Sequence, residues 1–402
     1  MDILHPALLL AMLSLFFGCQ NVSPTLPAGG SELRANHSLQ VSKTDYERFR
    51  NGKIKNAPPL PAVFTKDSLD LLEFPEIDDE LVLALQHQLR VLKLRKQRKL
   101  QRLAGLDASY EKLEKTIQLL LDRAYAKPTD LQYYLDAYQT WGKDKRGHVK
   151  FTGYYTPVLE VKKEADATYK YPLYSFPKNW EGHLPTRQEI DGKKALAGLG
   201  LELAYAKDPV DIYFMQVQGS GYVRFLDTGE RRLFRFAGDN GYRFRPIEKI
   251  ILANEDIDAK NVSVKGIKRF LKKNPHWRDT VLNSNPSYVF FQSKNSVAKG
   301  AGGVPLMEGI SIAVDSRYFP MGSVILASVP VYDRYDNISH HEFRVLLPQD
   351  VGGAVRGPGH VDVYSGVGNS GREAAGMLHH YGRMWLLLPK ENKQLALNDE
   401  EL

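Results

Sequence analysis

The sequence predicts a mainly β protein with helices near its N-terminus. From about Gly147 onward, short runs of β-branched and aromatic residues alternate with Gly, Pro, Asn and Asp, a pattern typical of short strands joined by turns. Between about Ser68 and Ala126, apolar residues instead recur every four residues, as they do along one face of an α-helix. Many short strands are typical of barrels, so we expect a β-rich body made of barrels, preceded by a helical segment.

The composition is that of a globular protein. The 402 residues are 43% hydrophobic and 25% charged, which excludes wholesale disorder and fibrous architectures. A net charge of +7 is small for this length, so it does not by itself indicate nucleic acid and fits a polyanionic polymer or a membrane surface equally well. With one cysteine, the sequence excludes an intramolecular disulfide and a Cys-rich zinc site.

The first 19 residues resemble the signal of a bacterial lipoprotein. Residues 7–18 are almost wholly apolar, and they are too short to span a bilayer, which takes ~20 residues. Gly18 before Cys19 fits a lipobox, in which the thiol is acylated, and Gln20 would direct the anchor to the periplasmic face of the outer membrane. Phe16 and the absence of Lys or Arg before the apolar run depart from that pattern, so an ordinary cleaved signal stays open.

The elements that follow are a tether, helices and then strands. Residues 20–62 have few large apolar side chains and read as a flexible tether. Two helices are predicted from leucine and isoleucine spacing, at Leu81, Leu85, Leu89 and at Leu113, Ile117, Leu121. Between them, seven basic residues in 90–102 form either a solvated helix face or a contact with anionic phospholipid or wall polymer.

Ten strand-forming runs are predicted after Gly147. They are 148–161, 170–176, 211–226, 231–238, 286–292, 311–315, 323–333, 343–350, 360–366 and 384–390. Two stretches, around Thr186–Tyr205 and at Val264–Leu271, are predicted as helices. No further apolar run is long enough to span a membrane.

Common catalytic and cofactor motifs are absent from the sequence. The Gly-rich segments 219–221 and 300–303 lack the Lys-Ser/Thr of a phosphate loop, and neither GxSxG nor HExxH occurs. His360 precedes Asp362 by two residues, and His379 adjoins His380. No third metal ligand stands out, so we expect neither metal nor cofactor.

Three aspartates draw attention because of their context. Asp350 and Asp362 lie in a glycine-dense segment, and Asp315 ends the apolar run that begins at Ser311. An ionised carboxylate near apolar strands is costly to bury unless it is paired or hydrogen-bonded. Each aspartate either holds a turn through backbone N–H groups or takes part in chemistry.

Six separated segments carry a resemblance to a known family. They are residues 153–157 (GYYTP), 185–191 (PTRQEID), 208–225, 285–292, 303–323 and 349–368. Together they resemble the membrane-bound lytic murein transglycosylase A family over about residues 150–390. The three aspartates match those for which the family's C-terminal three-aspartate domain is named.

The resemblance implies a double-psi β-barrel catalytic domain that is interrupted by a second, inserted β-barrel domain, with a groove for a glycan strand between them. The implied division is 1–19 signal, 20–62 tether, 63–157 N-terminal helical part of the catalytic domain, 158–287 insertion, and 288–402 C-terminal barrel part.

The implied activity is that of a lyase, a peptidoglycan lytic exotransglycosylase, although the residues leave exo against endo action open. It cleaves the β-1,4 bond between N-acetylmuramic acid and N-acetylglucosamine and leaves a 1,6-anhydro ring. The substrate's own 6-hydroxyl attacks, so one carboxyl group suffices as acid and then base. The resemblance assigns that role to Asp362, whose apolar neighbours favour the protonated form, with Asp350 and Asp315 as supports.

Substrate-binding residues implied by the resemblance are Gln216, Gln218, Ser220, Tyr155 and Thr156, with Gln216 and Gln218 on one strand face. Tyr154 would then point into the core. Lys268, Lys272 or Arg356 are candidates for contact with carboxylates of the peptide stems.

Other functions remain open at this point. A peptidoglycan-binding lipoprotein without turnover would keep the fold. A hydrolytic muramidase would need a second carboxylate about 5–9.5 Å from Asp362, for which Asp350 is a candidate, and a metal-dependent enzyme is more remote. The expected partners are peptidoglycan strands and the lipid anchor, with no nucleic acid; wall-synthesis or division proteins stay open.

Overall fold

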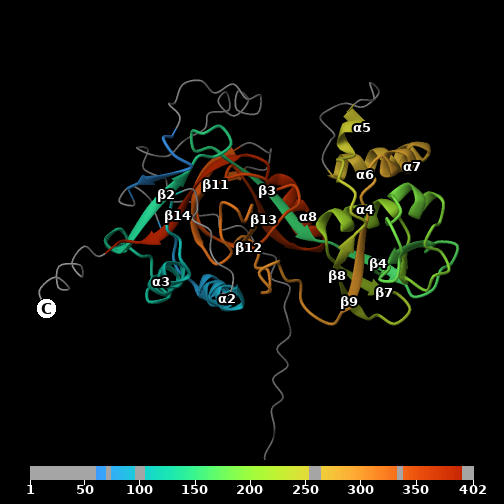
Figure 1. Ribbon diagram of the computed structural model, residues 1–402, viewed down its shortest axis with the longest axis horizontal. Helices are drawn as coiled ribbons and strands as arrows, with labels where there is room; N and C mark the ends of the chain where they lie inside the picture. The colour runs from blue at the N-terminus through green and yellow to red at the C-terminus, as the bar shows by residue number, and fades with distance from the viewer. Residues whose placement is uncertain (1–59, 69–73, 96–104, 253–263, 333–337, 392–402) are drawn as a thin grey trace, which may run out of the picture.

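The computed structural model describes residues 60–68, 74–95, 105–252, 264–332 and 338–391 (Figure 1). The predicted signal 1–19, Cys19, most of the tether, and residues 96–102 of the basic run lie outside the described residues. Within the described ranges, no helix is long and apolar enough to cross a membrane.

The first sheet has eight strands and nearly closes into a barrel. Its strands are β1 (Phe64–Asp67), β2 (Leu135–Thr140), β3 (Val149–Thr156), β10 (Ser311–Ala313), β11 (Val324–Tyr332), β12 (Ile338–Asp350), β13 (His360–Val367) and β14 (Tyr381–Pro389). The spatial order is β1-β2-β14-β11-β12-β10-β13-β3, and β3 also pairs with β14, where Tyr381 faces Lys150. This last pairing joins β3 back to β14, so six of the eight strands form a closed ring.

Alternation along the strands separates the barrel core from the outer face. On β13, Val361 and Val363 are buried in the main hydrophobic core, and on β3 Val149 and Phe151 join them. The intervening residues point the other way because successive side chains alternate across a strand. Asp362 and its neighbours on β3 therefore lie on the face turned away from the core.

Two helices pack against the barrel, as the leucine spacing predicted. They are α2 (Asp79–Arg95) and α3 (Tyr110–Leu121), which lie together at the lower edge of the barrel strands (Figure 1). Leu85, Leu113 and Ile117 are fully buried in the same core as the strands. Ser109 caps α3 by accepting a hydrogen bond from the Lys112 backbone N–H.

The second sheet has six strands in the order β5-β6-β4-β7-β8-β9. They are β4 (Val158–Lys162), β5 (Tyr171–Tyr174), β6 (Glu202–Ala206), β7 (Gly221–Phe225), β8 (Arg231–Asp239) and β9 (Val289–Lys294). Pro157 alone separates β3 of the first sheet from β4 of the second. The predicted fold class, mostly strands in two sheets with a near-barrel, is confirmed; the boundaries 158–287 and 288–402 stay a prediction, and β9 of the second sheet lies beyond 287.

Four helices accompany the second sheet, and one of them corrects the strand predicted over 211–226. They are α4 (Pro209–Gln218), α5 (Glu248–Leu252), α6 (Val264–Lys273) and α7 (Pro275–Asn283). α4 forms because Asp208 caps its start, Pro209 occupies its first turn and Gly219 ends it with a φ of 78°. Only Gly221–Phe225 of the predicted strand is a strand.

The two helices predicted elsewhere in this part of the chain had different outcomes. Val264–Leu271 is helical, as α6. The stretch Thr186–Tyr205 contains only a five-residue π-helical turn, Gln188–Gly192, and then β6. Gly198 and Gly200 follow that turn with φ values of +76° and +69°, which a continuing right-handed helix does not permit.

Candidate active site

Asp362 lies in the middle of β13, between β3 and β10. Its register partners are Thr152 on β3 and Ala313 on β10. The Thr152 hydroxyl donates to Oδ1 of Asp362, and His360 Nε2 lies 2.8 Å from the same hydroxyl oxygen. The Asp362 side chain is 24% exposed, so a substrate can reach a carboxyl group of which one oxygen is held in place.

His360 on the same strand is arranged as a donor to Thr152. Burial lowers the pKa of His360, and the nearby charges of Lys150 and Lys143 lower it further against the opposing effect of Asp362. The ring is therefore neutral at neutral pH. Because the Thr152 hydroxyl donates to Asp362, its oxygen accepts from Nε2–H of that neutral ring.

Asp350 ends β12 and has both carboxyl oxygens engaged. Oδ1 accepts from the backbone N–H of Ala301 at 2.8 Å and of Val351 at 2.9 Å, and Oδ2 accepts from the Tyr154 hydroxyl at 3.1 Å. Burial raises the pKa of Asp350, and the charge of Asp362 adds to that rise while the hydrogen bonds oppose it. The glycine-rich segment 300–303 thus supplies a backbone donor to an aspartate.

Both carboxylate oxygens of Asp315 accept hydrogen bonds from other groups of the protein. Its side chain is 4% exposed and accepts from Arg317 Nε at 2.9 Å, Arg317 Nη2 at 2.5 Å and the Gly357 backbone N–H at 2.8 Å. The Arg317 guanidinium holds the pKa of Asp315 well below its usual range. This carboxylate ties the segment around Gly357 to the end of β10.

Tyr154 corrects an expectation, because it belongs to the aspartate face and not to the core. Thr152, Tyr154 and Thr156 alternate onto one face of β3. The Tyr154 ring lies 5.3 Å from the Tyr364 ring, and Thr156 Oγ1 lies 2.9 Å from the Tyr364 hydroxyl. Tyr155 points the other way, so Tyr155 and Thr156 do not share a strand face.

The three residues predicted on one groove strand are split between a helix and its following turn. Gln216 and Gln218 are about 200° apart around α4. Gln216 is 4% exposed and its Nε2 donates to the Val289 carbonyl at 3.1 Å. Gln218 Oε1 accepts from the Tyr155 backbone N–H at 3.1 Å, and Ser220 Oγ accepts from the Phe236 N–H at 3.3 Å.

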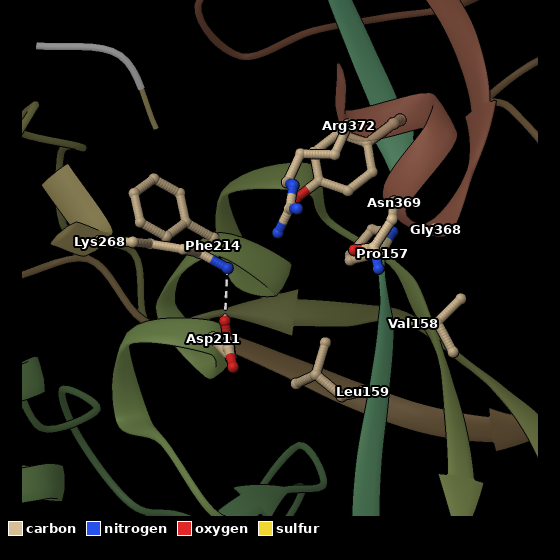
Figure 2. A pocket seen from close by; sticks show the side chains of 10 residues that line it. Pro157, Val158, Leu159, Asp211, Phe214, Lys268, Gly368, Asn369 and Arg372 are labelled. Atoms are coloured by element: carbon tan, nitrogen blue, oxygen red, sulfur yellow. Dashed lines mark hydrogen bonds and ion pairs between the residues drawn. The ribbon is translucent and has the colours of Figure 1, made fainter. Parts of the chain in front are cut away.

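A small pocket of about 130 Å³ lies at the junction of the two sheets (Figure 2). Its walls come from the β3–β4 connection, α4, α6 and α8 (Gly368–Met377). Tyr155, Phe214, Asn369 and Arg372 line it together with an ion pair between Lys268 and Asp211. It does not include the three aspartates discussed above.

The adjacent residues His379 and His380 pack against aromatic rings. His379 and His380 stack with centroids 4.2 Å apart, and His380 packs on Tyr332 at 4.7 Å. Burial lowers the pKa of His380 to about 3. Across the part of the chain that the structure describes, no group of three or more His, Cys, Asp or Glu side chains could hold a metal ion.

Sequence reasoning found the aspartates but missed Thr152 and His360 as their companions. From the sequence, His360 is a candidate for a metal pair or for a structural role, and not for a companion of the reacting aspartate. The available signal was the i, i+2 spacing of His360 and Asp362, which places both on one face. For Thr152, the pairing of β3 with β13 joins residues 210 positions apart, and no local pattern contains it.

The near-barrel presents one accessible, hydrogen-bonded aspartate beside a second sheet. Comparison with known proteins places a chain of this fold in the class of lytic transglycosylases. Two family models match the chain: "MltA specific insert domain" over residues 150–292 and "3D domain" over residues 310–388. Membrane-bound lytic murein transglycosylase A of Escherichia coli strain K12 is 37% identical over 266 residues, covering 64% of this chain and 70% of that protein. The Vibrio cholerae protein of that name is 39% identical over 259 residues, with the same coverage.

Solved structures agree with these relatives. The E. coli MltA crystal structure with bound chitohexaose has a TM-score of 0.71 at 29% identity, covering 84% of this chain and 98% of that one. A membrane-bound lytic murein transglycosylase from Agrobacterium tumefaciens has a TM-score of 0.65 at 25% identity, covering 80% and 95%. The chain belongs to the membrane-bound lytic murein transglycosylase A family.

Proposed function

We propose that this enzyme cleaves the β-1,4 bond between N-acetylmuramic acid and N-acetylglucosamine in peptidoglycan and leaves 1,6-anhydromuramic acid ends. The observation that carries the proposal is the contrast among the three aspartates: Asp362 alone is accessible and has an oxygen without a described partner. Family membership and the chitohexaose bound by the E. coli relative support a glycan substrate.

Asp362 performs both proton transfers in this proposal. Protonated on Oδ2, it gives its proton to the glycosidic oxygen as the bond to the leaving sugar breaks. The carboxylate then takes the proton of the muramic 6-hydroxyl while that oxygen bonds to the anomeric carbon. No water is consumed and Asp362 ends in its original protonated form. Thr152 holds Oδ1 throughout, so the reacting oxygen keeps its direction.

Asp350 and Asp315 act as supports. Burial raises the pKa of Asp350, and the nearby charge of Asp362 adds to that rise. Asp315 anchors the chain around Gly357, which leads into β13. Gln218 and Ser220 are the proposed residues along the glycan path. Thr156 and Tyr155 are buried, so we propose that they border this path from beneath its surface. Gln216 is also buried and positions α4 against β9.

A hydrolytic muramidase is the second candidate. It needs a second carboxylate free to activate water. Asp350 lies near enough for its pKa to respond to Asp362, yet Ala301, Val351 and Tyr154 occupy its oxygens. This arrangement favours the transglycosylase.

The proposed location is the periplasmic face of the outer membrane, through acylation of Cys19. Relatives are named as membrane-bound, and the residues that the structure describes include no membrane-spanning helix. The proposed partners are peptidoglycan strands, with wall-synthesis or division proteins as candidates for recruitment.

The test is the identity of the product. The protein from residue 20 onward is incubated with purified peptidoglycan, and the released fragments are weighed by mass spectrometry. Fragments one water lighter than reducing disaccharide peptides support the proposal. Reducing ends would assign hydrolysis, and wall binding without release would assign a binding lipoprotein.

A further inference from the structure

The pocket at the junction of the two sheets is lined by positively charged side chains from helices that accompany each sheet. Arg372 on α8 enters it from the barrel side, and Lys268 on α6 enters from the side of the second sheet (Figure 2). The Asn369 amide lies at the same wall as Arg372. At about 130 Å³ the space fits one small polar group of a ligand.

Arg372 has a guanidinium group without a described hydrogen-bond or ion-pair partner, although it lines the pocket. Arg123, Arg187, Arg224 and Arg317 each bind a carboxylate. Arg372 is half-buried, and no hydrogen bond or ion pair joins it to another residue in the described ranges. A guanidinium matches a carboxylate or phosphate through paired N–H donors, so its free donors point to an anionic ligand.

Lys268 and Asp211 set the charge of the opposite wall. They form an ion pair, and the Lys268 ammonium lies 5.4 Å from the centre of the Phe214 ring. With Arg372 the pocket carries two positive charges and one negative charge. A neutral N-acetylated sugar gains little from such a site, whereas an anion gains a charge-assisted hydrogen bond.

The position of the pocket identifies the source of the anion. The pocket lies where β3 and β13 end, at Pro157 and Gly368. Tyr155 is three residues along β3 from Thr152, a rise of about 10 Å. An extended peptide of three to five residues reaches roughly 10–17 Å, so a peptide stem attached to a muramic acid at Asp362 can bring a carboxylate to this rim.

We propose that Arg372, Asn369 and Lys268 form a binding site for a carboxylate of the peptide stem of peptidoglycan. This inference rests on the proposed peptidoglycan substrate, and it adds a determinant of which strands are cleaved well. The site favours peptide-bearing glycan over bare glycan, and the preference comes from binding and not from the proton transfers.

The test compares one glycan with and without its peptides. Peptidoglycan strands and the same strands stripped by an amidase are given to the wild type and to Arg372→Ala, Arg372→Lys and Asp211→Asn. Lys273→Ala, five residues further along α6 than Lys268 and exposed, is the matched control for loss of a positive charge. Circular dichroism and thermal melting confirm that each variant folds.

We expect Arg372→Ala to raise KM about tenfold for peptide-bearing strands, equivalent to about 1.4 kcal/mol, and Arg372→Lys to restore part of the loss. On stripped strands the same variants change KM less than twofold, and Lys273→Ala has that small effect on both substrates. Asp211→Asn lowers KM for peptide-bearing strands, because it removes the one negative charge of the pocket. Equal effects of Arg372→Ala on both substrates would overturn the inference.

A binding assay separates this inference from the proposed reaction. The free peptide released by the amidase is titrated by calorimetry into Asp362→Asn, with and without Arg372→Ala, so turnover is not required. Weaker binding to the double variant supports the site even if the product assay were to assign another reaction. Binding of inorganic phosphate but not of the peptide would refute a stem-carboxylate site.

Discussion

Replacing Thr152 by valine tests whether the orientation of Asp362 matters for catalysis. Valine keeps the shape of threonine and removes the hydroxyl that donates to Asp362 and lies 2.8 Å from His360 Nε2. The hydroxyl has one proton, so the variant loses one hydrogen bond to the carboxyl group. A hydrogen bond to a charged group contributes about 1.5–3 kcal/mol. Since about 1.4 kcal/mol is tenfold in rate, we expect kcat to fall roughly 10- to 150-fold.

The assay is the initial rate of release of fragments from purified peptidoglycan, measured over a range of substrate so that kcat and KM separate. KM changes little because Thr152 orients the acid and does not hold the distant sugars. Thr152→Ser keeps the hydroxyl and is the matched control, with kcat expected within about threefold of wild type, since it retains the same hydrogen bond. A folded Thr152→Val enzyme with wild-type kcat would show that this hydrogen bond does not position the acid.

Three further predictions concern other parts of the structure. Asp362→Asn abolishes fragment release, by roughly 10³-fold or more for loss of the only proton donor, while the protein still pellets with peptidoglycan. Asp315→Asn lowers the free energy of unfolding by about 2 kcal/mol at pH 7. The pKa of Asp315 is depressed in the folded state, so this difference is full above about pH 5 and shrinks as the pH falls below ~4 towards the folded-state pKa. Denaturant titrations at pH 7 and below about pH 3 would reveal the change. Gly153→Ala places a Cβ 2.5 Å from the Ala375 Cα, so it lowers the free energy of unfolding by about 1–3 kcal/mol. The control Gly376→Ala has no atom within 4 Å of its added Cβ and leaves the stability unchanged. Thermal melting of the two variants distinguishes these outcomes.

The strands and the N-terminal helices could be predicted because their signals are local. Alternation over residues 148–161 and 360–366 reports which side chains face the core, and Val361, Val363 and Phe151 are buried as that pattern requires. Leu85 and Ile117 likewise reach the core from the four-residue spacing. In each case the side chains that must be buried to stabilise the element recur with the period of a strand or of a helix. The sequence therefore shows that period directly.

The strand predicted over 211–226 was wrong for residues 211–218, which belong to α4, because the apolar content of this helix hides its period. Residues 212–216 are all buried, so neither helical nor alternating polarity is visible within the element. Its boundaries were readable, since Asp208, Pro209 and Gly219 are typical start and stop residues of a helix. The prediction gave more weight to the Tyr, Phe and Val residues, which favour strands, than to these helix start and stop residues. Tertiary packing decides the structure of such a segment.

Only part of the candidate site could be predicted from the sequence, and the reason is a different one. Asp362 and Asp350 stand out in a glycine-dense segment, but what distinguishes them is the set of donors around each one. Ala301 and Tyr154 reach Asp350 from 49 and 196 residues away, and the closure of the barrel brings them there. Resemblance to a family can imply which aspartate reacts. The physical reason that this aspartate reacts lies in tertiary contacts, which the sequence does not show.

Those contacts give one residue type three different chemical states. Asp315 is ionised and fully coordinated by Arg317 and Gly357, so it has no oxygen to offer a substrate. Asp350 is partly buried, and Tyr154 and two backbone N–H groups donate to its two oxygens. Asp362 keeps an exposed oxygen beside one held by Thr152. A site with one such carboxyl group supplies a proton and later removes one, but it supplies no nucleophile. In the proposed reaction the attacking oxygen comes from the bound glycan itself, which is the chemistry of an anhydro-forming enzyme.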